Sequence, residues 1–202
     1  MCVGAGRRRL VGLRRSAQHL AQGGFDAFKQ LVHTLASGTG RRILFLRTKH
    51  QARKLARQLT EAGIPSVDLH GNLSQPARDR NLAAFTRGDA KVLVATDIAA
   101  RGVHVDDVEL VVHCDPPSEH KAYLHRSGRT ARAGAAGDVV TVVLPEQRKD
   151  TQALLRKAGI TVAAKQVAAD SAAVRELVGE VAPRSRQLSP AGGPGRRRRA
   201  RG

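Results

Sequence analysis

Residues 125–134 read HRSGRTARAG, and the rest of the chain is organised around this stretch. Its three arginines, Arg126, Arg129 and Arg132, are three residues apart, with one glycine between them and another after them. On a helical turn, this spacing puts the three side chains on one side of the backbone. Crowded arginines repel one another unless an anion faces them, and a guanidinium group is well suited to phosphate oxygens. The stretch therefore predicts a phosphate site, with an ordinary solvated basic surface as the alternative.

The sequence around this stretch alternates between short apolar runs and amphipathic segments. Apolar runs of strand length predict strands at residues 43–46, 66–69, 91–95, 110–112 and 139–144, with a weaker one at 160–164. Helical spacing of apolar residues predicts helices at residues 25–36, 49–62, 75–85, 119–126, 145–158 and 171–181. This alternation is typical of an α/β fold in three layers, with a mainly parallel sheet and helices on both faces. Functional side chains gather at the carboxyl ends of the strands in such folds.

Charge is the outlying property of the composition, with a formal net charge of +18. Residues 1–24 carry five arginines and residues 183–202 carry seven, and neither segment has an acidic residue. The stretch between them has 23 basic and 17 acidic residues, so a mildly basic body carries two strongly basic ends. This distribution favours a polyanionic partner, with nucleic acid ahead of an anionic membrane. Because aromatic residues make up only 2% of the chain, we expect nucleic acid to be held by its backbone rather than by base stacking.

The composition also suggests how the chain is divided. We expect a disordered basic arm at residues 1–24, one domain at 25–165, a possible short helix within 166–182 and a disordered basic tail at 183–202. No apolar run approaches the roughly 20 residues of a membrane span, so no membrane partner is expected. The two cysteines have neither metal-site spacing nor the pattern of a disulfide framework, so no metal site is expected, and a cytoplasmic location is the default.

Two stretches together resemble a known family. HRSGRTARAG resembles the last signature motif of DEAD-box RNA helicases, and ATDIAARG at residues 95–102 resembles the motif before it. LFLRTK at 44–49, HGNLSQPAR at 70–78 and FTRG at 85–88 resemble three further motifs. The resemblance covers roughly residues 25–158, which correspond to the second of the two RecA-like domains of such an enzyme. It implies a RecA-like fold, RNA as a partner, ATP and Mg²⁺ as cofactors, and an N-terminal RecA-like domain that binds most of the ATP.

The resemblance also implies a role for particular residues. Arg129 and Arg132 align with the arginine fingers that reach the γ-phosphate of ATP, and His125 aligns with the histidine that couples ATP to the RNA-binding surface. Arg126 and Gly102 are implied as further ATP-binding or coupling residues. RNA contact is implied for a larger set: Thr48, Gly71, Gln75, Arg78, Arg87, Gly88 and Thr96.

Several of these residues have a purely structural alternative. Arg78 and Arg87 are equally typical of exposed charges at helix ends, and the Thr96 hydroxyl is as suited to capping a helix as to binding a ligand. Asp97 is expected to cap a helix or to pair with Arg101. The family often has an aspartate that contacts the ribose at the position of His104, and here Asp106 or the residue after it is the available substitute.

The sequence contains neither a G-x-x-x-x-G-K-[ST] phosphate loop nor a DEAD-like acidic motif. Hydrolysis of ATP needs the lysine and the Mg²⁺ ligands that those motifs supply, so we expect these 202 residues to be inactive alone. The leading hypothesis is the C-terminal domain of a DEAD-box ATP-dependent RNA helicase. The alternative is a basic RNA-binding or regulatory module that kept the fold and lost catalysis, and a more distant one is another two-domain nucleic-acid translocase.

Overall fold

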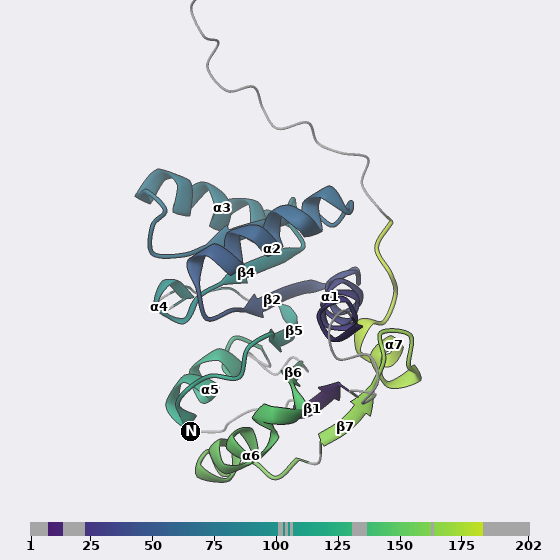
Figure 1. The fold of residues 1–202 in the computed structure, drawn as a ribbon. Helices are drawn as coiled ribbons and strands as arrows, with labels where there is room; N and C mark the ends of the chain where they lie inside the picture. Colours follow the sequence, from purple (N-terminus) through teal and green to yellow (C-terminus); the bar gives the residue numbers. More distant parts are fainter. Residues whose placement is uncertain are drawn as a thin grey trace, which may run out of the picture.

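Seven parallel strands form a single sheet at the centre of the molecule. The computed structural model describes residues 8–13, 23–100, 103, 105, 107–130, 137–162 and 164–183. In these residues the strand order is β3-β4-β2-β5-β6-β1-β7 (Figure 1). The strands are β1 (Arg8–Leu13), β2 (Arg41–Phe45), β3 (Ser66–Leu69), β4 (Val92–Ala95), β5 (Val108–His113), β6 (Asp138–Val143) and β7 (Ala164–Val167).

Helices cover both faces of this sheet, as the sequence predicts. They are α1 (Gly23–Ala36), α2 (Lys49–Glu61), α3 (Gln75–Arg87), α4 (Asp97–Ala100), α5 (His120–Ser127), α6 (Arg148–Lys157) and α7 (Ala172–Val178), with a 3₁₀ turn η1 (Pro145–Gln147) before α6. Buried side chains of α1, α2 and α7 form one core cluster with the sheet, and those of α3 to α6 form a second cluster on the other face. None of the helices in the described residues is both long and apolar enough to cross a membrane.

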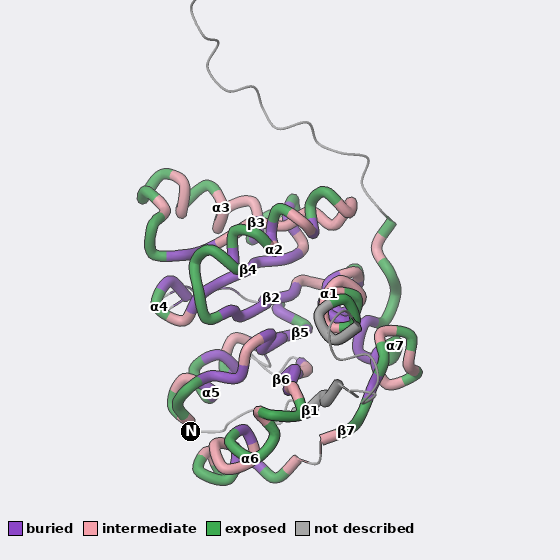
Figure 2. The backbone as a smooth tube through the Cα atoms, viewed as in Figure 1, coloured by how far each residue is buried: buried purple, intermediate pink, exposed green. Residues whose placement is uncertain are grey.

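The central strands are mostly apolar because both of their faces are covered. Ile43 and Phe45 of β2 belong to one core cluster, whereas the intervening Leu44 belongs to the other. Alternate side chains of a strand point to opposite faces, so a parallel strand between two helix layers favours apolar residues on both faces. The central strands β2, β4, β5 and β6 are mostly buried, and the outer faces of the helices are exposed, in the tube view (Figure 2).

Local signals in the sequence set most of the helix ends. Thr48 is the N-cap of α2, and its side-chain oxygen accepts a hydrogen bond from the backbone N–H of Gln51. Gly63, just after this helix, has φ +82°, which a residue with a side chain adopts only at a cost. Ser74 is the N-cap position of α3 as predicted, but its hydroxyl makes no capping hydrogen bond.

The two ends of the domain differ from the sequence prediction. Residues 1–24 were expected to be a disordered arm, yet Arg8–Leu13 forms β1, which pairs in parallel with both β6 and β7. The weak strand predicted at 160–164 lies at Ala164–Val167, and the possible short helix is α7. Because Val174, Leu177 and Val178 are buried in the same core cluster as α1, the domain extends past the predicted boundary at residue 165. The predicted basic tail lies outside the described residues after residue 183.

Candidate functional site

The two arginine-and-glycine stretches of the sequence meet at an ion pair. Arg126, on the last turn of α5, donates from Nε and Nη2 to the two carboxylate oxygens of Asp97, at 2.5 and 2.7 Å. Its Nη1 donates to the backbone carbonyl of Asp115, at 2.7 Å. Asp97 begins α4 directly after β4, and Asp115 follows β5, so the pair lies at the carboxyl ends of two strands. Asp97 was expected to cap a helix or pair with Arg101; its partner in the structure is Arg126.

Because of this ion pair, Arg126 is not available to contact a ligand directly. The residue is only 3% exposed, and all three guanidinium nitrogens have acceptors within the domain. Bidentate pairing of this kind fixes the orientation of both groups. Arg126 therefore holds the two motif segments together. It does not lie in one row with Arg129, as the spacing predicts, because α5 ends at Ser127 and a turn follows.

The buried guanidinium group of Arg126 packs on an aromatic ring that belongs to a cluster of three rings. The Arg126 guanidinium carbon lies 5.2 Å from the centre of the Phe45 ring, within the range of a cation–π contact. The His113 ring packs edge-on against Phe45 and Tyr123, with ring centres 6.1 and 4.8 Å apart. Burial lowers the pKa of His113 well below its ordinary value, and the nearby charge of Arg126 lowers it further. His113 is thus a neutral core residue, held by a 3.2 Å contact between Nδ1 and the Thr141 hydroxyl.

The turn after α5 places Arg129 beside the ion pair. Arg129 is half-buried, and its Nη1 donates to the backbone carbonyl of Val103. A small cavity of about 20 Å³ is lined by residues of both motif segments and of β2: Phe45, Asp97, Ala100, Ala122, His125, Arg126 and Arg129. The resemblance implied that Arg129 reaches the γ-phosphate of ATP bound mainly by another domain. In the structure its guanidinium group is held by its own domain, at the Val103 carbonyl.

Three of the residues predicted to bind RNA lie at the carboxyl edge with exposed groups. Thr48 is exposed, and its hydroxyl donates to the Gln51 side chain, at 2.8 Å, while it caps α2. Gln75 is exposed at the start of α3 and donates to Asp79 at 2.8 Å. At Gly71 a side chain would meet no atom within 4 Å, so the backbone there faces open space. An extended backbone of another molecule could approach all three.

Arg78 and Thr96 lie at the same edge but are tied to the domain. Arg78 is half-buried and donates from Nη2 to the carbonyl of Ala99 at 2.8 Å, which fastens α3 to α4. Thr96 is 8% exposed, and its carbonyl accepts the N–H of Ala100 at the start of α4. Each residue therefore has a contact within its own domain. Arg78 is not the exposed charge considered as its alternative, and the contact of Thr96 is made by its backbone carbonyl rather than by its hydroxyl.

A hydrogen-bonded network shapes the loop that contains Gly71. His70 is 7% exposed; its Nδ1 accepts the backbone N–H of Asn72 at 3.3 Å, so its Nε2 carries the proton that faces Asp68 at 3.0 Å. Asn81 of α3 donates to the backbone carbonyl of Asp68 at 2.8 Å. The network fixes the loop between β3 and α3, and it was not predicted, because its members lie on three different elements.

Two of the residues predicted to bind RNA, Arg87 and Gly88, do not belong to this site. Arg87 and Gly88 lie at the far end of α3, about 20 Å of helix away from Gln75. Arg41, the first residue of β2, donates to the carbonyl of Thr86 there, which places this end of α3 at the amino edge of the sheet. Arg87 is paired with Asp89 at 2.9 Å, and Gly88, at φ +84°, is the helix cap. The pattern FTRG therefore ends a helix and does not join the site.

The same edge contains one of the two acids considered for the ribose. Asp107 is paired with Arg41 at 2.9 Å and lies directly before β5, at the amino ends of the strands. It therefore lies at the opposite edge of the sheet from Thr96, which follows the carboxyl end of β4. The remaining predicted site residues, Gly102, Asp106 and Arg132, lie outside the described residues, as do Arg101 and His104.

Asp115 is the site residue that sequence reasoning missed. Its carbonyl accepts from Arg126, and its carboxylate accepts the backbone N–H of Arg47 at 3.0 Å, so it connects the loops after β2 and β5. The feature of the sequence that could have identified Asp115 as a site residue is its position just after a buried strand. The neighbouring Cys114 is buried, and burial raises the pKa of its thiol, which leaves it an inert core residue.

Comparisons with a family model, with curated proteins and with solved structures all relate this chain to one family of proteins. Residues 24–134 match the family described as "Helicase conserved C-terminal domain". The chain is 39% identical over 135 residues to DEAD-box ATP-dependent RNA helicase 7 from Spinacia oleracea, covering 67% of this chain and 19% of that protein. It is 38% identical to the ATP-dependent rRNA helicase RRP3 from Mycosarcoma maydis, covering 84% of this chain and 32% of that protein. Among solved structures, S. cerevisiae Dbp5 bound to RNA and ADP BeF3 superposes with a TM-score of 0.70 at 27% identity, covering 87% of this chain and 46% of that one.

The chain thus spans less than a third of the length of these two curated relatives. The matched region begins with α1 and ends at residue 134, so it contains both motif segments of the site.

Proposed function

Because this chain belongs to the helicase conserved C-terminal domain family, and is a C-terminal helicase domain of the DEAD-box RNA helicase type, we propose that it holds an RNA backbone and offers arginines to ATP. In this proposal the ATP and Mg²⁺ are bound mainly by an N-terminal RecA-like domain. ATP supplies the phosphoanhydride bond whose hydrolysis drives the opening of the two domains. Asp97, Arg126 and Asp115 keep the two motif segments in one fixed arrangement.

The observation that carries the proposal is the Asp97–Arg126 ion pair at the strand ends. It brings Asp97 of the first motif segment to Arg126 of the second, although a strand lies between them in the sequence. A surface basic run would instead leave its arginines in solvent. An ion pair buried on its arginine side specifies one arrangement of the two segments, and with it the position of the turn that carries Arg129.

Arg129, Arg132 and His125 are the residues that we assign to ATP and to its coupling with RNA. His125 is exposed and lines the same small cavity as Arg129, which supports a shared role for the two side chains. When Arg129 binds a phosphate oxygen, it must either break its hydrogen bond to the Val103 carbonyl or keep that bond with one nitrogen and bind the phosphate with another. A guanidinium group has five N–H donors, so it can do the latter.

The RNA side of the site is assigned to Thr48, Gly71 and Gln75, with Arg78 and Thr96 as the residues that position α4. The exposed hydroxyl, amide and loop backbone are groups that contact phosphate and sugar without reading base identity. We therefore expect RNA binding with little sequence preference.

The test adds this chain to a DEAD-box N-terminal RecA-like domain that does not hydrolyse ATP alone. We expect the wild-type chain to restore RNA-dependent phosphate release. Arg129→Ala should remove most of that activity, because arginine fingers are worth about 10³–10⁵ in turnover. Arg156→Ala is the matched control, since Arg156 is an exposed arginine near the end of α6 and should leave the activity unchanged.

Stability has to be measured alongside activity. Arg129→Ala removes the hydrogen bond to Val103, which costs about 1–3 kcal/mol for a charged donor, so the variant should still fold. A folded Arg129→Ala chain with full activity would overturn the finger assignment. Failure of the wild-type chain to restore hydrolysis, while it binds RNA, would favour a non-catalytic RNA-binding module.

A further inference from the structure

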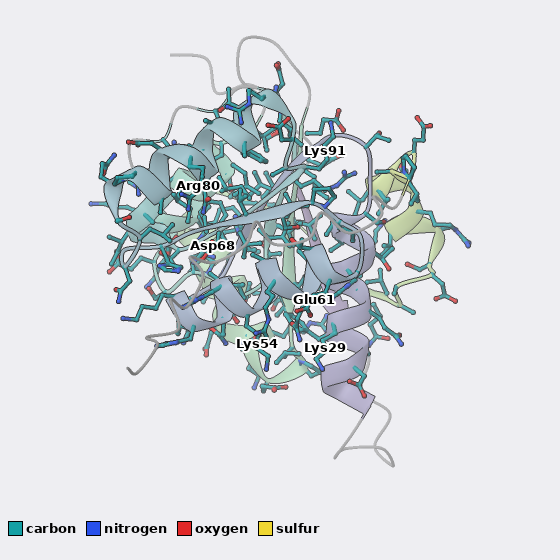
Figure 3. All side chains as sticks on the ribbon, turned by 90° about the horizontal axis from the view of Figure 1, so that it is seen from above. Lys29, Lys54, Glu61, Asp68, Arg80 and Lys91 are labelled. Carbon is teal, nitrogen blue, oxygen red and sulfur yellow. The ribbon has the colours of Figure 1, made fainter. Side chains whose placement is uncertain are left out.

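The outer surface of α2 carries a run of positive charge that the site described above does not use. Its members are Lys49, Arg53, Lys54 and Arg57, hereafter the α2 basic stripe, and all four are exposed. Lys49, Arg53 and Arg57 are four residues apart and so lie along one side of the helix, over about 12 Å. Figure 3 shows Lys54 on α2 and Arg80 on α3, on opposite sides of the sheet.

The stripe is poorly neutralised by its own domain. Among the described residues, Lys49, Arg53 and Lys54 have no acidic partner within ion-pair distance, and Arg57 pairs with Glu61 at 3.4 Å. Lys29 of α1, by contrast, pairs with Asp26 at 3.7 Å. The stripe is thus a local excess of charge, rather than one half of a surface ion-pair network.

The placement of these charges also opposes the stability of the helix. The first turn of α2 contains no acidic residue, and its first six residues include Lys49, His50, Arg53 and Lys54. Cations near a helix N-terminus are unfavourable because that end of the helix dipole is positive, and like charges four residues apart repel. A sequence that breaks local rules in this way is typical of a functional surface, where an external anion offsets the repulsion.

The position of α2 indicates which anion this is. The helix begins at Lys49, directly after Thr48, which we assign to the RNA backbone, and it leads away from the carboxyl edge of the sheet. We infer that the α2 basic stripe is a second contact surface for RNA, which holds the phosphates of the strand beyond the site formed by the motif segments. This inference rests on the proposed function. The stripe carries no aromatic side chain, so its contacts are electrostatic and independent of base sequence.

The experiment compares two double variants that each remove two positive charges. Arg53→Gln/Lys54→Gln changes the stripe, and Arg156→Gln/Lys157→Gln changes an adjacent exposed pair on α6, which packs on the opposite face of the sheet. Binding of the full chain to a polyuridylate oligomer is measured over a range of salt concentrations. The slope of log K against log salt should become shallower by about 1.4 for the stripe variant, at about 0.7 per phosphate contact, and stay unchanged for the α6 variant.

The outcomes separate this inference from the proposed function. If the wild-type chain does not bind RNA at all, the proposed function fails. If it binds and the stripe variant has the wild-type slope, or if both variants lose the same amount, the stripe is not a contact surface and the proposed function stands. If the stripe variant keeps RNA binding but loses binding to polyglutamate, the surface is for an acidic protein and the inference is wrong.

Discussion

At the scale of single residues, the pairing of Asp97 with Arg126 is what fixes the site. We predict that Asp97→Ala destabilises the domain by about 2–4 kcal/mol. The change leaves the buried guanidinium group without its carboxylate, and removal of one partner from a buried ion pair typically costs 3–5 kcal/mol. The expected loss is at the lower end because Asp97 is 36% exposed and water can replace part of its contact. Denaturant unfolding followed by circular dichroism measures the change.

A second variant tests whether the cost comes from the unpaired charge. In Asp97→Ala/Arg126→Met the buried cation is also replaced, by an apolar side chain that can pack on Phe45. We expect the double variant to be more stable than Asp97→Ala alone, because replacement of both partners is far less costly than removal of one. Equal or greater destabilisation of the double variant would mean that Arg126 stabilises the fold through packing rather than through its charge.

At the scale of elements, α7 is an integral part of the domain. Val174, Leu177 and Val178 are buried against α1, and the buried Arg42 of β2 donates from Nη2 to the carbonyl of Val178 at 2.7 Å. Burial lowers the pKa of Arg42, and the charge of Glu109 partly opposes this. The element therefore contributes apolar area and also accepts a hydrogen bond from a guanidinium group in the interior.

We predict that a chain ending at residue 165 does not fold stably, whereas a chain ending at residue 183 does. The shorter chain lacks three buried side chains of α7, worth about 1.5–3 kcal/mol each, and this sum is comparable to the whole stability of an ordinary domain. Thermal unfolding of the two chains provides the measurement, and the longer one is the control because both lack residues 184–202. A cooperative transition at the same temperature in both chains would show that α7 is dispensable.

At the scale of the whole molecule, the net charge of +18 governs how the chain meets a polyanion. Residues 184–202 carry seven arginines. We predict that removal of residues 184–202 weakens binding to single-stranded RNA and makes the slope of log K against log salt shallower by up to about 5. This value is the effect of seven phosphate contacts at about 0.7 each.

The folded domain serves as the internal control for this prediction. The truncated chain keeps α7 and the core clusters, so its thermal unfolding should match that of the full chain. Salt-dependent binding that is unchanged by the truncation would assign the electrostatic attraction to the body of the domain. A strong preference for one RNA sequence would contradict backbone binding altogether.

The sequence was enough to predict the α/β class, most of the helices and strands, and the carboxyl edge as the place of the site. These features follow from short-range patterns, since an apolar run such as Ile43 to Phe45 and the cap residues Thr48 and Gly63 act within a few positions. The motif segments were recognisable for the same reason, because each is contiguous in the chain.

The tertiary structure alone decided which side chains face one another. The spacing of Arg126 and Arg129 predicted one row of phosphate ligands, but packing of α5 beside β5 and α4 buried the first, and the second donates to Val103. The structure likewise placed Arg87 at the opposite edge of the sheet. Strand β1 escaped prediction because its place between β6 and β7 is determined by hydrogen bonds between backbones, which leave no periodic pattern in so short a segment.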